Sequence, residues 1–130
     1  MKKTVKERAP SRLDVNRLIE KIRNHPEFGR IGMILCHNGV VRSTSRSGEG
    51  VTEIAVRADR RKLAEIIRDI GKMPGIIAVE AEIAEGVLYP GDDIMAVAIG
   101  GDFRENVFAA LIEAVNRVKA EVTAKTEKLS

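Results

Sequence analysis

Arg104 occupies a position where a positive charge needs an explanation. It lies seven residues before Leu111 and fourteen before Val118, so a helix would place these residues on one face, which is otherwise apolar. Burying an unpaired guanidinium is costly, so Arg104 must reach an acid, a backbone carbonyl, solvent or a bound anion. An internal ion pair, or an arginine that extends past the helix end, would explain the position without a ligand.

Two further cations stand near the ends of apolar segments. Lys119 follows Val118 at the edge of the same stripe, where partial desolvation would lower the amine pKa and make it a usable base or nucleophile. An ordinary lysine in the last turns of a helix fits the position as well. Arg42 ends an apolar strand and begins the polar loop 42–50, which we expect to be mobile and where binding residues often gather. Together with Arg104, Arg42 and Lys119 could surround a phosphate, but their types and positions alone do not identify a reaction.

The turn Gly100-Gly101-Asp102 precedes the last helix. Free backbone N–H groups and the helix dipole favour an anion at such a place, and Gly101 would let it approach the backbone. The alternative is a close strand-to-helix turn in which Asp102 caps the helix, with Glu105 completing a capping box.

The hydrophobic pattern predicts three helices and four strands that would position these residues. Helical spacing is found within 11–26, 60–73 and 102–122, and strand patterns cover 30–41, 51–58, 75–84 and 94–100. The order α-β-β-α-β-β-α is typical of an α+β domain, with helices packed on one face of a mixed or antiparallel sheet. A bulge or turn is expected at Asn38-Gly39.

The chain of 130 residues fits a single domain, which we place at 13–122, with a disordered basic arm at 1–12 and a frayed tail at 123–130. Hydrophobic residues make up 44% and charged residues 32%, as in soluble globular proteins. Aromatic residues make up only 3%, which disfavours a stacking surface for single-stranded nucleic acid. We therefore expect no nucleic-acid partner.

Membrane and metal functions also find no support in the sequence. No segment approaches the roughly 20 apolar residues of a membrane span, and the N-terminus has no signal-peptide pattern. The one cysteine, Cys36, excludes an internal disulfide and suits the cytoplasm. His25 and His37 lack metal-ligand spacing, so we expect no metal or cofactor.

Several segments together resemble a known family. They are "NGVVRSTSRSGEGVTEI" and "EAEIAEGVLYPGDDIMAVAIGGDFRENVFAALIEAVNRVK". They are similar to the MoaE family, the large catalytic subunit of molybdopterin synthase, over roughly residues 28–120. The family's G-x-V-R is matched by Gly39 to Arg42, its strand-turn-strand by Gly86 to Met95, and its helix arginine and catalytic lysine by Arg104 and Lys119. The resemblance implies a MoaE-like fold of the α/β hammerhead type.

The resemblance also implies a reaction. In that family a small ubiquitin-like subunit ends in Gly-Gly bearing a thiocarboxylate, and it donates sulfur to a cyclic pyranopterin monophosphate during molybdenum cofactor biosynthesis. Arg42, Arg104 and Gly101 would then bind the substrate phosphate. Lys119 would act on the substrate or on an acyl intermediate, with Lys125 near the place of the family's second catalytic lysine. The resemblance further implies a homodimer.

The chain departs from the family pattern at one substrate-contacting position and at one catalytic position. Phe103 stands where the family usually has His, and Thr126 stands where it has the second lysine, with Lys125 and Lys128 as neighbours. A second hypothesis is therefore a catalytically inactive, dimeric binding or regulatory protein on the same fold, which uses Arg42 and Arg104 to hold an anionic ligand or a partner's tail.

Overall fold

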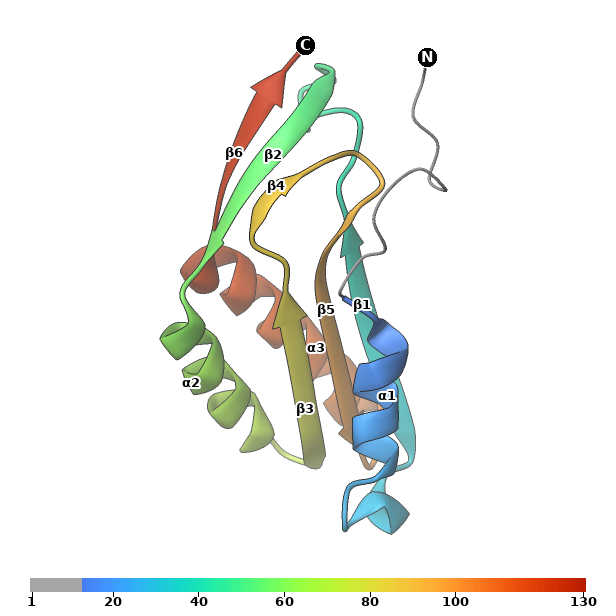
Figure 1. Ribbon diagram of the computed structural model, residues 1–130. Coiled ribbons are helices and arrows are strands. Elements are labelled where there is room, and N and C mark those ends of the chain that lie inside the picture. Colours follow the sequence, from blue (N-terminus) through green and yellow to red (C-terminus); the bar gives the residue numbers. More distant parts are fainter. Residues whose placement is uncertain (1–12) are drawn as a thin grey trace.

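The computed structural model describes residues 13–130, and the basic arm predicted for residues 1–12 lies outside the described residues. Figure 1 shows the arrangement of the elements. In chain order they are α1 (Val15–Arg23), a 3-10 turn (Phe28–Arg30), β1 (Met33–Val40), β2 (Val51–Ala58), α2 (Arg60–Gly71), β3 (Ile76–Ile83), β4 (Gly86–Leu88), β5 (Asp93–Gly101), α3 (Arg104–Arg117), the π-helical turn η3 (Val118–Val122) and β6 (Thr123–Leu129).

The strands form two antiparallel three-stranded sheets. The larger has the order β1-β5-β3 and the smaller β4-β2-β6. The α+β class predicted from the sequence is confirmed, but the single sheet is wrong. Consecutive strands β1 and β2 belong to different sheets, so the loop between them crosses from one sheet to the other (Figure 1).

Helices cover both faces of the larger sheet, so the expected packing on one face is wrong. Ala96 and Ala98 of the central strand β5 pack against Leu18 and Ile22 of α1. The alternate residues of β5 face the main core on the other side, which α2 and α3 cover (Figure 1). Because β5 is apolar on both faces, it requires a cover on each side.

The tail expected to fray is strand β6. It pairs with β2 over most of its length, and Val56 lies opposite Lys125 and Ile54 opposite Glu127. The segment is polar and largely exposed, so its hydrophobic pattern carries no strand signal. Its order comes from backbone pairing with the edge of β2.

Aspartate side chains cap two of the helices, and the end of β1 is irregular. Asp14 accepts a hydrogen bond from the Asn16 N–H at 2.9 Å and caps α1, and Asp59 accepts one from the Lys62 N–H at 3.0 Å and caps α2. The irregularity expected near Asn38-Gly39 appears as a register shift between Gly39 and Val40.

An ionic network fixes the end of α3 against α2. Arg117 donates to Asp69 of α2 at 2.8 Å and to Glu121 of the π-helical turn at 2.9 Å, and Lys62 lies 3.3 Å from Glu121. The hydrogen bonds from Arg117 are the main cause that lowers the pKa of both carboxyl groups. The network holds the turn from which β6 begins.

This network predicts a specific acid sensitivity. Folded-state pKa values below the ordinary 3.8 of Asp69 and 4.5 of Glu121 mean that the stabilisation is present above those values and is lost as pH falls below them. The free energy of unfolding of Arg117→Met should therefore fall less than that of the wild type between about pH 5 and pH 3. Denaturant titrations across this range measure the difference. Equal acid slopes in the wild type, Arg117→Met and the control Arg61→Met would contradict the assignment.

Candidate functional site

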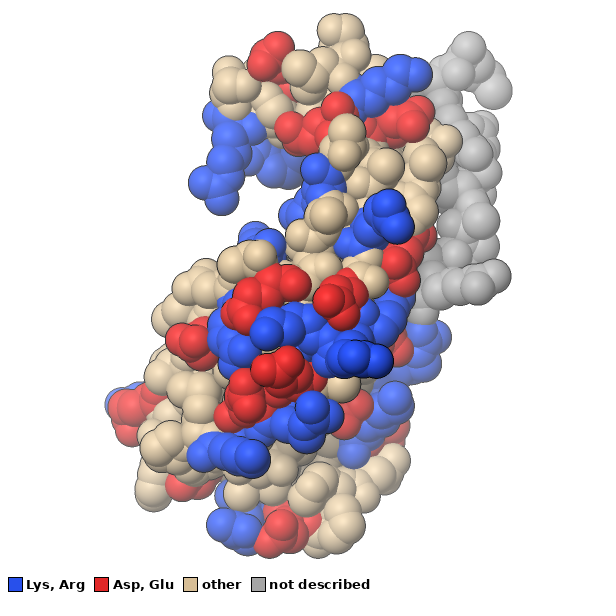
Figure 2. Space-filling view, turned by 90° about the vertical axis from the view of Figure 1, so that its left-hand side faces the viewer, with Lys and Arg blue, Asp and Glu red and all other residues tan. Residues whose placement is uncertain are grey.

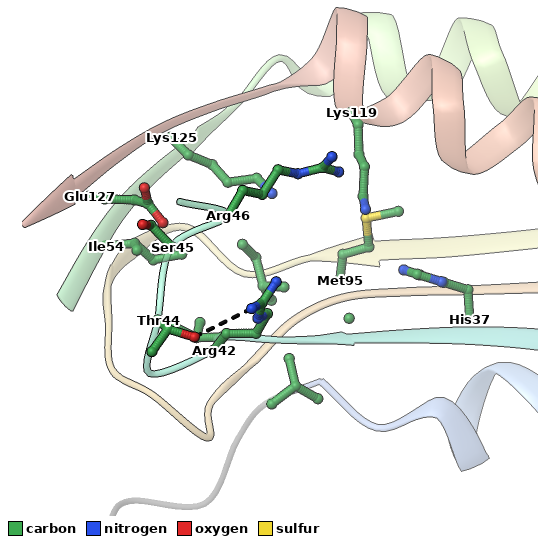
Figure 3. A pocket seen from close by; sticks show the side chains of 14 residues that line it. His37, Arg42, Thr44, Ser45, Arg46, Ile54, Met95, Lys119, Lys125 and Glu127 are labelled. Carbon is green, nitrogen blue, oxygen red and sulfur yellow. Dashed lines mark hydrogen bonds between the residues drawn. The ribbon is translucent and has the colours of Figure 1, made fainter. Parts of the chain in front are cut away.

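A cavity of about 530 Å³ lies where the two sheets meet. Residues from β1, the loop after it, β2, β5, the π-helical turn and β6 line it. Figure 3 shows the labelled side chains around this space. Its polar and charged lining consists of His37, Arg42, Thr44, Ser45, Arg46, Lys119, Lys125 and Glu127.

The elements explain how lysines from the end of the chain reach the cavity. Lys119 leaves the π-helical turn and points toward Met95 (Figure 3). Lys125 and Glu127 are two residues apart on β6, so they project to the same face of the small sheet. Their partners in the β2 register, Val56 and Ile54, are buried, which marks this face as the inner one.

The lining carries four cations and one carboxylate, Glu127. Within the part of the chain that the structure describes, no carboxylate lies at ion-pair distance from Arg42, Arg46, Lys119 or Lys125. Arg42 donates to the Thr44 hydroxyl at 3.3 Å. On the face seen in Figure 2, Lys and Arg side chains border a hollow between the small-sheet part and the rest. Such an excess of positive charge suits a bound anion.

Two pKa shifts report on this environment. Burial lowers the pKa of Lys125 from its ordinary 10.5, and the charges of Lys119 and Arg46 lower it further, while Glu127 opposes them. Burial also lowers the pKa of His37, with a smaller contribution from Lys119. His37 is therefore neutral at pH 7, and its Nε2 is buried without a hydrogen-bond partner among the described residues.

The structure brings Arg42, Lys119 and Lys125 together but leaves Arg104 and Gly101 elsewhere. Gly101 pairs with Met33 at the start of β1, whereas Arg42 follows the far end of that strand. Eight strand residues span about 26 Å, so the expected gathering of Arg42, Arg104 and Lys119 in one pocket of a single chain is wrong. The helical spacing of apolar residues predicts on which face of the helix Arg104 lies. It does not predict how far Arg104 lies from residues at the other end of the sheet, such as Arg42.

Arg104 and the glycine turn have structural surroundings of their own. The Arg104 side chain is 78% exposed, and its Nε lies 3.3 Å from Glu105. A Cβ on Gly101 would lie 2.7 Å from the Gly75 carbonyl oxygen, so close packing accounts for the glycine. Asp102 accepts bonds from the Phe103 N–H at 2.5 Å and the Asn106 side chain at 2.9 Å, so a carboxylate of the chain itself occupies this position. A substrate-binding role for Arg104 and Gly101 stays a prediction.

Sequence reasoning missed His37, Arg46 and Glu127 as lining residues. His37 has no metal-ligand spacing in the sequence, and Glu127 lies in the polar tail 123–130, whose pattern predicts fraying. Arg46 lies in the loop expected to be mobile, but the pattern Ser45-Arg46-Ser47-Gly48 is typical of a hydrogen-bonded β-turn. That signal would have placed Arg46 on an ordered segment.

The described residues hold no group of three or more His, Cys, Asp or Glu side chains that could bind a metal ion. None of the helices in residues 13–130 is long and apolar enough to cross a membrane.

Comparison with known families decides which family this is. Residues 9–121 match the family described as MoaE protein, which is most of the chain. The chain belongs to the MoaE family. The resemblance noted in the sequence is thereby confirmed, and Arg42 and Lys119 of the family pattern both line the cavity. A comparison with curated proteins gave no match.

Solved structures agree with membership of the MoaE family. Molybdopterin synthase from Staphylococcus aureus is 25% identical with a TM-score of 0.70, over 85% of this chain and 84% of that one. Molybdopterin cofactor biosynthesis protein E from Burkholderia multivorans is 26% identical with a TM-score of 0.71, over 91% and 84%. The fold is also shared by a complex of subunits 1 and 2 of molybdopterin-converting factor from Helicobacter pylori. That match has 13% identity and a TM-score of 0.69, over 90% of this chain and 80% of that one.

The coupling between the two lysines is testable. Removing the neighbouring positive charge in Lys119→Gln should raise the pKa of Lys125 toward 10.5. Titration of lysine side chains labelled with ¹³C at Cε, followed by NMR, measures this, and Lys125→Gln identifies the signal. Lys128→Gln, which changes the opposite face of β6, is the control. An unchanged Lys125 titration in Lys119→Gln would show that the two amines are not neighbours.

Proposed function

We propose that this MoaE family chain is the large subunit of a molybdopterin synthase. It takes sulfur from the thiocarboxylated C-terminus of a small ubiquitin-like partner and transfers it to a cyclic pyranopterin monophosphate in molybdenum cofactor biosynthesis. The observation that carries the proposal is the cavity between the sheets, where Arg42 and Lys119 of the family pattern meet Lys125.

Arg42 binds the substrate phosphate in this proposal. A guanidinium donates two parallel hydrogen bonds to a phosphate, and such charge-assisted bonds are stronger than neutral ones. The Thr44 hydroxyl holds one guanidinium nitrogen at 3.3 Å. A bound phosphate would replace the missing carboxylate partner of Arg42 and reduce the repulsion among the cations of the cavity.

The two lysines act on the reacting groups. Lys119 extends into the cavity from the π-helical turn, where it can transfer a proton or attack an acyl carbon of the partner tail. Lys125 has a lowered pKa, so a larger fraction of its amine is neutral at pH 7 than for an ordinary lysine. It therefore suits the second catalytic lysine, although it stands one residue before Thr126.

The partner is a small sulfur-carrier subunit with a C-terminal Gly-Gly. The Helicobacter pylori relative is described as a complex of two subunits of molybdopterin-converting factor, which supports a second subunit here. A Gly-Gly tail has no side chains to exclude it from a narrow site, and its terminal thiocarboxylate is an anion that the lysines of the cavity attract. Each transfer of sulfur leaves the tail as a carboxylate.

We also propose that the chain forms a homodimer and works in the cytoplasm. Three large apolar residues of α3 and its N-cap are exposed: Phe103 at 65%, Phe108 at 48% and Ile112 at 63%. Phe108 and Ile112 are four residues apart and share one helix face. Exposed apolar groups that cluster in this way are typical of protein interfaces.

The proposed reaction can be reconstituted. The chain, mixed with a thiocarboxylated Gly-Gly partner and the cyclic pterin, should yield the dithiolene product, measured by chromatography. Lys119→Ala should reduce the rate by about 100-fold or more, because proton transfer or nucleophilic attack is lost. Its affinity for the partner, measured by calorimetry, should fall far less than the rate, because Lys125 and the arginines of the cavity remain. Lys128→Ala should keep wild-type activity.

Absence of product with the partner demonstrably bound would reject the catalytic proposal and favour the second hypothesis, a binding protein for an anionic ligand or a tail. Phe103 in place of the family histidine and Thr126 in place of the second lysine favour that alternative. Full activity of Lys119→Ala would reject the role of Lys119 alone.

A further inference from the structure

We propose that Arg46, with Lys125, forms an oxyanion-binding position in the cavity, so that Arg46 is a specificity-determining residue of this chain. The ligand class is a carboxylate or a phosphate. The inference deepens the proposed function, since such an oxyanion would come from either the partner tail or the substrate. It requires only anion binding, however, and not sulfur transfer.

The loop that carries Arg46 is a built structure. Ser45 donates its N–H to the Glu49 carbonyl oxygen at 2.7 Å, and the Gly48 N–H donates to the Ser45 carbonyl oxygen at 3.0 Å. The second bond closes a β-turn with Arg46 as its first central residue. Gly48 has φ of 89°, a conformation that glycine adopts without strain.

Buried anchors tie this turn to the rest of the fold. Ser45 is 8% exposed, and its hydroxyl accepts the Glu49 N–H at 3.2 Å and lies 2.9 Å from the Ser47 hydroxyl. At the base of the loop, Thr44 bridges Gly50, whose carbonyl oxygen accepts the Ser130 N–H at 3.0 Å. Hydrogen bonds within the loop and at its base therefore hold the backbone at Arg46 beside the cavity.

The guanidinium of Arg46 faces other cations. Figure 3 shows Arg46 and Lys125 next to each other on one side of the cavity, with Arg42 on the other. Burial and the charge of Lys119 lower the pKa of Lys125, and the positive charge of Arg46 lowers it further, against the opposing charge of Glu127. No carboxylate in residues 13–130 lies at ion-pair distance from Arg46.

Two like charges held side by side on ordered segments destabilise one another. An oxyanion between them would turn that repulsion into two charge-assisted interactions. The net charge of the cavity supports a second anion-binding position in addition to the one at Arg42. Four cations exceed the single carboxylate by three charges, which one monovalent anion cannot neutralise. A substrate phosphate and a tail carboxylate present together would bring the charges closer to balance.

The test measures anion binding by the isolated chain with calorimetry at low and at physiological salt. The probes are inorganic phosphate, a short peptide that ends in Gly-Gly with a free carboxylate, and the same peptide with an amidated C-terminus. The variants are Arg46→Gln, Arg46→Lys, and Arg61→Gln as a control on exposed α2, outside the cavity. Thermal denaturation checks that each variant is folded.

We expect Arg46→Gln to weaken the binding of at least one of the two anionic probes about tenfold, while Arg61→Gln binds like the wild type. A loss confined to the free-carboxylate peptide identifies the tail as the source of the oxyanion. A loss confined to phosphate identifies the substrate. Arg46→Lys should recover part of the affinity, because it keeps the charge but not the planar fork of donors.

The proposal is overturned if the wild type binds neither anion, if it binds the amidated peptide as tightly as the free carboxylate and ignores phosphate, or if Arg46→Gln binds both anions normally. These outcomes are independent of turnover. A chain that fails to transfer sulfur but loses anion affinity in Arg46→Gln keeps this position while the proposed function fails. If an Arg46→Gln chain transfers sulfur at the full rate and binds anions normally, the proposed function is kept and the oxyanion position at Arg46 is rejected.

Discussion

The pairing of β6 with β2 is the constraint on which the candidate site depends. It returns the end of the chain across the junction of the sheets, and strand alternation sends Lys125 and Glu127 to the inner face. The π-helical turn Val118–Val122 makes the reversal from α3 into β6, and its last carbonyl accepts the Asp59 N–H at 3.0 Å, which ties it to the start of α2. π-Helical turns are rare in proteins as a whole, but many of those that occur lie at functional sites. Here the turn carries Lys119, so one reversal of the chain delivers both lysines to the cavity.

Charge is distributed differently in the cavity and on the rest of the surface. Elsewhere several acids and bases are paired, as in the contact of Arg60 with Glu85 at 2.9 Å and the network around Arg117. The net charge of the whole chain is only +3, so four cations around one carboxylate form a local excess. The folding free energy opposes such a cluster, since like charges repel, and a site that binds anions is the ordinary reason for accepting that repulsion. In the function proposed for this MoaE family chain, the anions are the cyclic pterin phosphate and the tail of the partner.

The sequence predicts the parts of the site that lie at the ends of strongly patterned elements. Arg42 ends an apolar strand and Lys119 borders an apolar helix stripe, so both stand out. The hydrophobic pattern does not reveal β6, because a polar edge strand has no hydrophobic period. Arg46 lies on a loop whose only sequence signal is the β-turn pattern of residues 45–48. Arg104 is the opposite case, a residue that the sequence pattern singles out but that does not line the cavity. Helical periodicity gives the direction of a side chain around the helix axis but not its distance from residues on other elements. The α+β content follows from local hydrophobic periodicity and is confirmed. The division into two sheets depends on pairing between strands far apart in the chain, which local periodicity does not determine.

The most direct test is a crystal structure of the chain with the cyclic pyranopterin monophosphate bound. The account predicts that the phosphate lies between the two sheets, within hydrogen-bond distance of the Arg42 guanidinium, with the Lys119 amine facing the pterin. A phosphate bound at the start of α3 beside Arg104, with the cavity between the sheets empty, would contradict it.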